Sequence, residues 1–171
     1  FRMRVRVAVI GLLAPFLAQC AGGGPSFSSL SSLFGSGSPA APAHRVATKT
    51  GDASAAATLV SQYRTANGLP PVVADATLNR AAEVQARAVA QAGSLSHGEF
   101  AGRMASFGIN GASAENLVAG SRTVDQAMAR WKASPGHNRN LLMPEARRIG
   151  IAYASSPGAG YEHYWAMVLA Q

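Results

Sequence analysis

The segment IGIAYASSPGAGYEHYWAMVL, residues 149–169, decides the fold. Ile149, Ile151 and Tyr153 alternate with smaller residues, which is the two-residue period of a β-strand. Residues 155–160 are rich in Ser, Gly and Pro and predict a turn. Residues 161–169 are largely apolar at both alternating sets of positions, as in a strand that is covered on both faces. We therefore predict a C-terminal antiparallel pair of strands between two helical layers.

Upstream of this pair, apolar residues recur with helical spacing and are separated by capping residues. Four such segments are expected, over about residues 52–67, 75–92, 100–107 and 123–135. Asp75 and Thr123 are suited to begin helices, and Gly93 is suited to end one. The predicted fold class is α+β: an α–β–α sandwich with three to four helices and an antiparallel sheet.

The N-terminal region resembles an export signal. Met3 is the expected initiator, followed by Arg4, Arg6 and a short apolar run over residues 7–17 that is too short to span a membrane. Residues 17–20, LAQC, resemble a bacterial lipobox and predict lipidation of Cys20 and attachment to a membrane. The alternative is ordinary cleavage at the small-x-small sequence Ala18-Gln19-Cys20, because Gln19 departs from the lipobox pattern.

The chain divides into three predicted parts. Residues 1–20 are the signal peptide with a possible lipobox, residues 21–51 a flexible linker rich in Gly, Ser, Pro and Ala, and residues 52–171 the folded domain. The protein is expected to be exported, as a periplasmic or outer-membrane lipoprotein or as a secreted protein. The net charge of +7 is scattered rather than clustered with aromatic residues, so no nucleic-acid partner is expected. A single cysteine excludes an internal disulfide.

The order of motifs from Leu59 to Leu169 resembles the CAP superfamily, named for cysteine-rich secretory, antigen 5 and pathogenesis-related 1 proteins. The motifs are LSH at residues 95–97, AENL at 114–117, WKASPGHNRNL at 131–141 and YWAMV at 164–168. Within that superfamily the chain is similar to the short bacterial branch that has no disulfides. The resemblance implies an α–β–α sandwich, in agreement with the prediction from residue patterns.

The resemblance also implies a cleft lined by two His and two Glu, which in some members binds a divalent metal. His97 and Glu115 match the first His and the first Glu, whereas Ser134 and Tyr164 stand where the other two are expected. The bacterial branch offers His137 near the same cleft. A zinc site of His97, Glu115 and His137 with micromolar affinity is therefore expected, weakened by the two departures. His163 is next to Tyr164 but cannot be assumed to replace the missing His, because a shift of one residue along a strand reverses the face.

Each of these residues has a structural alternative. His97 can be a loop residue bonded to the backbone, and Glu115 can order a loop between helices. His137 can belong to a turn that ends the fourth helix, in which Asn138 and Asn140 make local hydrogen bonds.

Three functions remain open. The main hypothesis is a cleft-based binding module for a lipid, a peptide or a cell-envelope ligand. The alternatives are a weak hydrolase that uses His97 and Glu115 as acid and base, with or without metal, and a structural envelope protein. No motif for a nucleophile or a phosphate loop is found in the sequence.

Overall fold

The computed structural model describes residues 47–49, 53–158 and 160–171. The predicted signal peptide, Cys20 and most of the predicted linker lie outside these residues. The five helices of the described part are α1 (Ala53–Ala66), α2 (Ala76–Ala92), α3 (Phe100–Ser106), α4 (Val124–Ala133) and α5 (Pro135–Leu141). The five strands are β1 (Ala47–Lys49), β2 (Val73–Ala74), β3 (Ser113–Ala119), β4 (Arg148–Ser155) and β5 (His163–Ala170).

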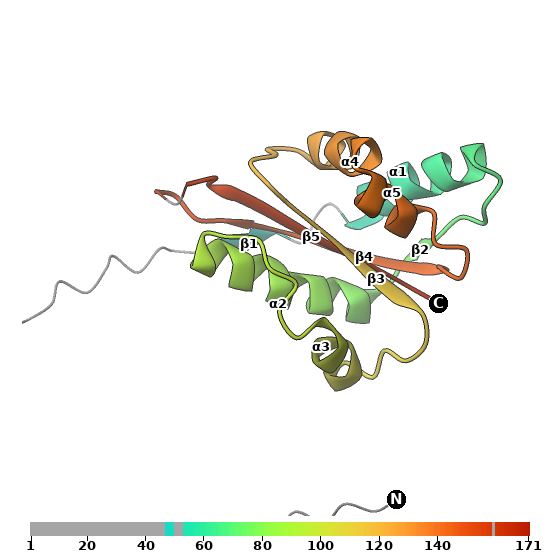
Figure 1. Ribbon diagram of the computed structural model, residues 1–171, viewed down its shortest axis with the longest axis horizontal. Helices are drawn as coiled ribbons and strands as arrows, with labels where there is room; N and C mark the ends of the chain where they lie inside the picture. Colours follow the sequence, from blue (N-terminus) through green and yellow to red (C-terminus); the bar gives the residue numbers. More distant parts are fainter. Residues whose placement is uncertain (1–46, 50–52, 159) are drawn as a thin grey trace, which may run out of the picture. The chain divides into compact units, whose positions relative to one another are not determined.

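The strands form one sheet in the order β1-β4-β5-β3, with β2 also paired to β4. Strands β3, β4 and β5 pair antiparallel along their whole lengths, and β5 lies between the other two. Strand β1 pairs antiparallel with one end of β4, and β2 pairs parallel with the other end. The outer side of β3 is therefore one edge of the sheet (Figure 1).

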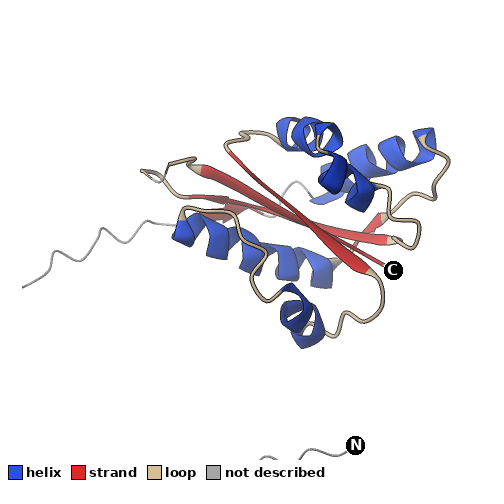
Figure 2. Ribbon diagram, in the orientation of Figure 1, coloured by secondary structure: helices blue, strands red, loops and turns tan. Residues whose placement is uncertain are grey.

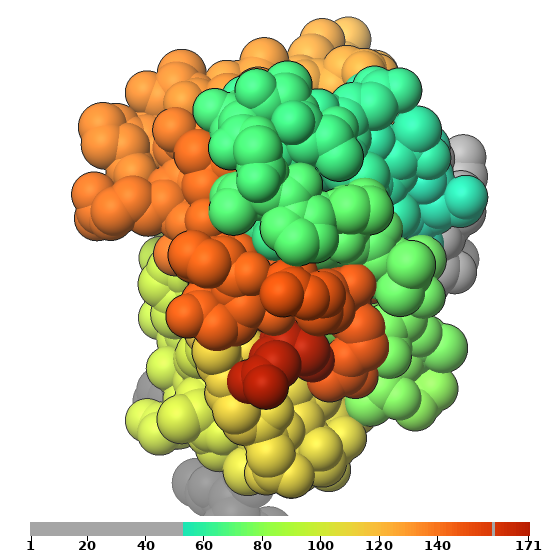
Figure 3. Space-filling model, turned by 90° about the vertical axis from the view of Figure 1, so that its right-hand side faces the viewer, coloured from blue at the N-terminus to red at the C-terminus, as the bar shows by residue number. Residues whose placement is uncertain are grey.

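Two layers of helices cover the sheet, as predicted. One face packs against α1, α4 and α5 in a cluster that contains Trp131, Trp165 and Leu141. The other face packs against α2 and α3 in a cluster dominated by alanines of α2. Figure 2 shows the sheet between these layers. Figure 3 shows the same layers from the side, with α1 at the top and the segment between α3 and β3 at the bottom.

The central strand β5 has the burial that the sequence predicted for it. Residues 164–170 are all buried. Trp165, Met167 and Leu169 point into the first cluster, whereas Tyr164, Ala166 and Val168 point into the second. Both faces of β5 are thus core, which explains its nearly continuous apolar sequence.

The structure corrects three details of the prediction. There are five helices in the described residues rather than three to four, because residues 135–141 form a helix of their own. The sheet is mixed rather than antiparallel, because β2 runs parallel to β4. Residues 47–49 form a strand, whereas the sequence predicts a flexible linker there.

Helix α2 lies unusually close to β4 where a glycine permits it. A Cβ atom on Gly150 would lie 2.1 Å from the carbonyl carbon of Leu78 and 2.3 Å from the nitrogen of Asn79. Asn79 uses this proximity to accept a hydrogen bond from the backbone N–H of Ile151 at 2.9 Å. The helix begins at the N-cap Asp75 and ends at Gly93, as predicted, and Gly93 has a left-handed conformation.

Among the described residues, no helix has both the length and the apolar character that a membrane span requires.

Candidate functional site

Glu115 lies in the edge strand β3, not in a loop between helices as the sequence suggested. Its side chain points toward the α2–α3 layer, together with Leu117 and Ala119. Only 1% of this side chain is exposed. A buried carboxylate requires compensation by charge or hydrogen bonds, so its partners define the local chemistry.

Two basic side chains provide that compensation. His97, in the loop between α2 and α3, places Nδ1 2.8 Å from Oε1 of Glu115. Arg103 of α3 donates from Nη2 to Oε2 of the same carboxylate. Paired with this guanidinium, Glu115 is a carboxylate that can only accept hydrogen bonds. Nδ1 of His97 therefore carries the proton, and Nε2 is left as the basic nitrogen.

The loop that carries His97 is held from beneath by a buried glutamine. Gln85 of α2 is 4% exposed and donates from Nε2 to the carbonyl of Ser96 at 2.5 Å. Arg103 also points a second guanidinium nitrogen at the carbonyl of His97, at 3.4 Å. More than half of the His97 side chain is nevertheless exposed, so its ring is fixed at one nitrogen and accessible at the other.

His137 belongs to helix α5 on the opposite layer. The sequence predicted a turn here, but Pro135 begins a new helix directly after α4 ends. Proline is well suited to the first helical position, because its missing N–H would have no intrahelical partner there. Burial lowers the pKa of His137, and the positive charge of His97 lowers it further. Burial and a protonated His97 therefore both disfavour the charged form of His137.

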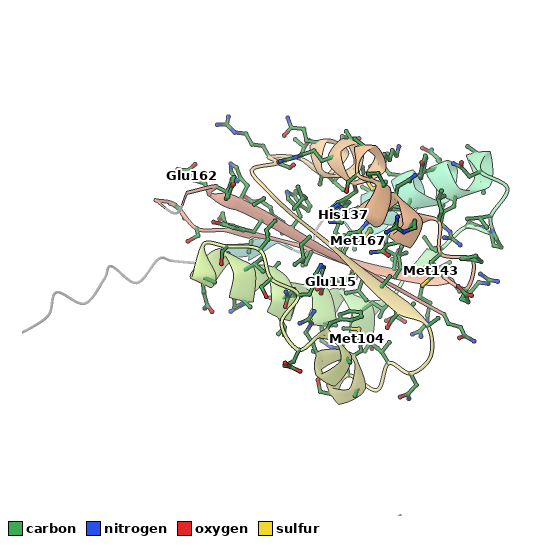
Figure 4. The ribbon with its side chains drawn as sticks, in the orientation of Figure 1. Met104, Glu115, His137, Met143, Glu162 and Met167 are labelled. Carbon is green, nitrogen blue, oxygen red and sulfur yellow. The ribbon has the colours of Figure 1, made fainter. Side chains whose placement is uncertain are left out.

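Asparagines join α5 to β3. The fully buried Asn116 donates from Nδ2 to the carbonyl of His137 at 3.0 Å. Asn140 donates to Oδ1 of Asn116 at 2.9 Å and to the carbonyl of Glu115 at 3.1 Å. Asn116 and Asn140 therefore hold α5, and His137 with it, against the edge strand by contacts that are distant in sequence, rather than by local turn contacts. Figure 4 shows Glu115 and His137 on the two sides of β3.

A cavity of about 500 Å³ opens where these elements meet, and we call it the edge cleft. Its walls come from the loop after α2, from β3, from α4 and α5, and from the loop between β4 and β5. The apolar or small lining residues are Gly93, Leu95, Leu117, Val118, Ala119 and Trp131, and the polar ones are Ser94, Arg130, Ser134, His137 and Tyr161. The edge cleft thus crosses the edge of the sheet from one helical layer to the other.

The candidate residues divide into three groups by position. Ser134 and His137 line the edge cleft, whereas His97 and Glu115 are joined to each other beside it. Tyr164 was expected in the cleft, but it is fully buried under α2 and does not line the cavity. His163 lies elsewhere and contacts the hydroxyl of Tyr153 through Nδ1 at 2.6 Å.

A comparison with models of known protein families identifies the family of this chain. The model of the CAP family, described as the cysteine-rich secretory protein family, matches residues 57–169. The chain belongs to this family. The match includes every residue of the edge cleft and of the His97–Glu115–Arg103 cluster.

One curated relative of this CAP domain is a bacterial protein. The uncharacterized protein YkwD of Bacillus subtilis is 31% identical over 104 residues, which are 57% of this chain and 40% of that protein. The chain therefore spans less than half the length of that curated relative.

Solved structures support the fold. An outer surface protein of Borrelia burgdorferi has a TM-score of 0.59 at 18% identity, covering 67% of this chain and 87% of that one. An extracellular SCP-domain protein of Bacillus anthracis has a TM-score of 0.60 at 20% identity, covering 71% of this chain and 41% of that one.

The arrangement in this CAP domain does not fit the zinc site that the resemblance implied. Within the described ranges, no three His, Cys, Asp or Glu side chains are grouped as a metal ion would require. Both oxygens of Glu115 are engaged, one by His97 and one by the guanidinium of Arg103. The position beside the carboxylate that a cation would take is therefore occupied by a cation of the protein itself.

Arg103 and Arg130 are the charged residues of this region that reasoning from the sequence missed. Arg103 follows the apolar residue Phe100 on a short helix, and the two contact each other, with 5.6 Å from the guanidinium carbon to the ring centre. The available signal was Glu115 itself, since an acidic residue within an apolar strand needs a basic partner. Nothing in the local pattern says which of the dispersed arginines provides it.

Proposed function

We propose that this chain is an exported cell-envelope protein whose CAP domain binds a lipid, a peptide or another envelope ligand in the edge cleft. The supporting observation is the cleft itself, since about 500 Å³ with mostly apolar walls and a few polar groups is typical of small-ligand sites. Similar structures come from an outer surface protein and an extracellular protein, which favours the same compartment for this chain.

The test is to fill the edge cleft with a larger side chain and to measure the loss of ligand binding. Ser134, half-buried on its wall, is replaced by Tyr, and the exposed Ala101 of α3 is replaced by Tyr as the matched control. A neutral dye that fluoresces in apolar surroundings should bind to the wild type and to Ala101→Tyr, and much more weakly to Ser134→Tyr. Equal dye binding by all three proteins would place the apolar site elsewhere and contradict the proposal.

Membrane attachment is proposed at Cys20, which lies outside the described residues. The proposal is supported by the position of this cysteine directly after an apolar export segment. Cys20→Ser should move the protein from the membrane fraction to the soluble fraction. A wild-type protein that is already soluble and begins at Ala21 would contradict lipidation.

A second candidate function is weak hydrolysis, and the His97–Glu115 contact favours it. A His oriented by a carboxylate, with its other nitrogen accessible, is the arrangement of a general base. If this function is correct, His97→Gln abolishes turnover of a test ester while dye binding in the edge cleft is retained. Turnover that survives His97→Gln would leave binding as the function.

A further inference from the structure

One wall of the edge cleft is the outer edge of β3, where the outward carbonyl oxygens already accept hydrogen bonds from side chains. In β3 the even-numbered residues face β5, as the hydrogen bond from Gly120 N–H to the carbonyl of His163 shows. The odd-numbered residues therefore direct both their N–H and C=O groups outward. The side chains of Trp131 and Arg130 donate to the outward carbonyls of Leu117 and Ala119 at 3.2 and 2.5 Å.

The N–H groups of the same two residues remain on that edge. No described residue accepts a hydrogen bond from Leu117 N–H or Ala119 N–H. Both residues line the edge cleft, and two positions along a strand are roughly 7 Å apart. At Leu117 and Ala119 the edge thus offers two unbonded N–H donors, whereas both outward carbonyls already accept a hydrogen bond. A peptide strand that paired with it would leave its own N–H groups facing carbonyls that are already bonded.

The polar side chains around this edge can also donate hydrogen bonds, and none of them is acidic. The lining includes the guanidinium of Arg130, the hydroxyl of Ser134 and the imidazole of His137, and it includes no Asp or Glu. The carboxylate on this strand, Glu115, is buried and neutralised by Arg103. Exposed acidic residues on neighbouring segments, such as Glu99 and Glu162, are not part of the cleft wall.

From this arrangement we infer that the edge cleft selects acidic small molecules: an anionic oxygen group, carboxylate or phosphate, carried on an apolar body. The anionic group lies at Arg130 and the N–H groups of Leu117 and Ala119, where every neighbouring polar group can donate. The apolar body lies against Leu95 and Trp131. This inference rests on the proposed binding function and specifies the class of ligand.

The test compares amphiphiles that share one decyl chain and differ in the head group. Decanoate and decyl phosphate should displace the neutral dye from the edge cleft of the full chain. Decanol should do so about tenfold less effectively, and decyltrimethylammonium least. The two anionic probes distinguish a carboxylate from a phosphate head, and acetate or inorganic phosphate alone should not displace the dye.

Two variants separate a local contact from the overall charge. Arg130→Gln should weaken the binding of decanoate about tenfold, a change of about 1.4 kcal/mol, and should weaken the binding of decanol much less. Lys132 is on the same helix but contacts the ring of Tyr63 and does not line the cleft. Lys132→Gln therefore removes the same charge away from the cleft and should leave the affinity for decanoate unchanged. Equal loss in both variants would show that only the net charge matters.

The possible failures can be told apart. If all four amphiphiles displace the dye equally, and Ser134→Tyr prevents it, the cleft binds ligands but the inference of anion selectivity is wrong. If the dye does not bind in the edge cleft at all, the binding function itself is wrong.

Discussion

Arg103 is the partner of Glu115, a residue that the resemblance implied as a metal ligand. Its guanidinium is bonded to the buried carboxylate of Glu115, and its side chain is only 10% exposed. A buried ion pair of this kind is costly to break, because removal of one partner leaves an uncompensated charge, typically at a cost of about 3–5 kcal/mol. Arg103 therefore compensates the buried carboxylate of Glu115, which in turn orients His97.

The first prediction concerns zinc. Millimolar zinc at neutral pH should not raise the melting temperature of the wild type, because Arg103 occupies the position beside Glu115. Arg103→Met should be less stable but should gain a zinc-dependent rise, since His97 and Glu115 are then available as ligands. Arg103→Lys, which keeps the charge, is the control without such a gain. A rise in the wild type that is lost in His97→Ala would restore the zinc site expected from the resemblance.

The second prediction concerns the protonation of His137. Burial is the larger cause of its lowered pKa and the charge of His97 the smaller, so NMR titration should give a pKa below the usual value of about 6.5. His97→Gln should raise this pKa without restoring the usual value. Because the folded pKa is lowered, the folded state loses stability as the pH falls below about 6.5. An unchanged pKa in His97→Gln would show that the two rings do not interact.

At the scale of elements, the contact between α2 and β4 depends on Gly150. Any side chain there would meet the backbone of α2, which cannot move without displacing the whole helix. This close approach also lets the side chain of Asn79 accept a hydrogen bond from the backbone N–H of Ile151. Ile151 lies on β4 between the part that pairs with β1 and the part that pairs with β2. The packing of small alanines of α2 onto the sheet follows from the same short distance.

The third prediction is therefore that Gly150→Ala is strongly destabilising. Overpacking typically costs about 1–3 kcal/mol, and contact with backbone places this substitution at or above the upper limit. Gly102→Ala in α3 is the control, since its Cβ would meet only Glu99, at 3.9 Å, and it should be neutral or slightly stabilising. Urea unfolding of both variants measures the difference. A similar free energy of unfolding for the two would mean that α2 adjusts at no cost.

Elements with strong local signals could be predicted from the sequence. Asp75 and Gly93 mark the ends of α2, and the alternation in residues 149–153 marks β4. Helix α5 was missed because Pro135-Gly136 is typical of a helix end, and it became a beginning only through contacts of α5 with β3. The short strands β1 and β2 exist because they pair with β4, which no local pattern encodes.

In the candidate site, too, some residues could be predicted from the sequence and others could not. His97, Glu115 and His137 came from the resemblance, and the structure places them around one sheet edge. Arg103 and Arg130 could not be identified because their roles depend on which residues the fold brings near them. Tyr164 was misplaced because alternation along β5 directs it to the α2 side, away from the edge cleft.

At the scale of the whole molecule, the two edges of the sheet are protected in different ways. At the β3 edge, side chains of α4 and α5 bond the outward carbonyls, and the edge cleft uses the remaining donors. At the β4 edge, backbone pairing with β1 and β2 protects the two ends. Unprotected edges invite pairing with other chains, so both devices contribute to solubility as well as to stability.

The last prediction follows from the β4 edge. The sequence placed the start of the domain at residue 52, but β1 pairs Ala47 with Ser155 and Lys49 with Tyr153. A fragment of residues 52–171 should therefore melt at a lower temperature than one of residues 44–171, by about 4 °C for each kcal/mol lost.

Proline substitutions in the longer fragment provide the internal control. Because even-numbered residues of β4 face β5, the N–H groups of Ala47 and Lys49 face β4, and that of Thr48 faces outward. Lys49→Pro removes a hydrogen bond of the ladder and should lower the melting temperature more than Thr48→Pro does. Equal melting of both fragments, with no difference between the two proline variants, would show that β1 adds no stability and that the domain begins at residue 52, as the sequence alone suggested.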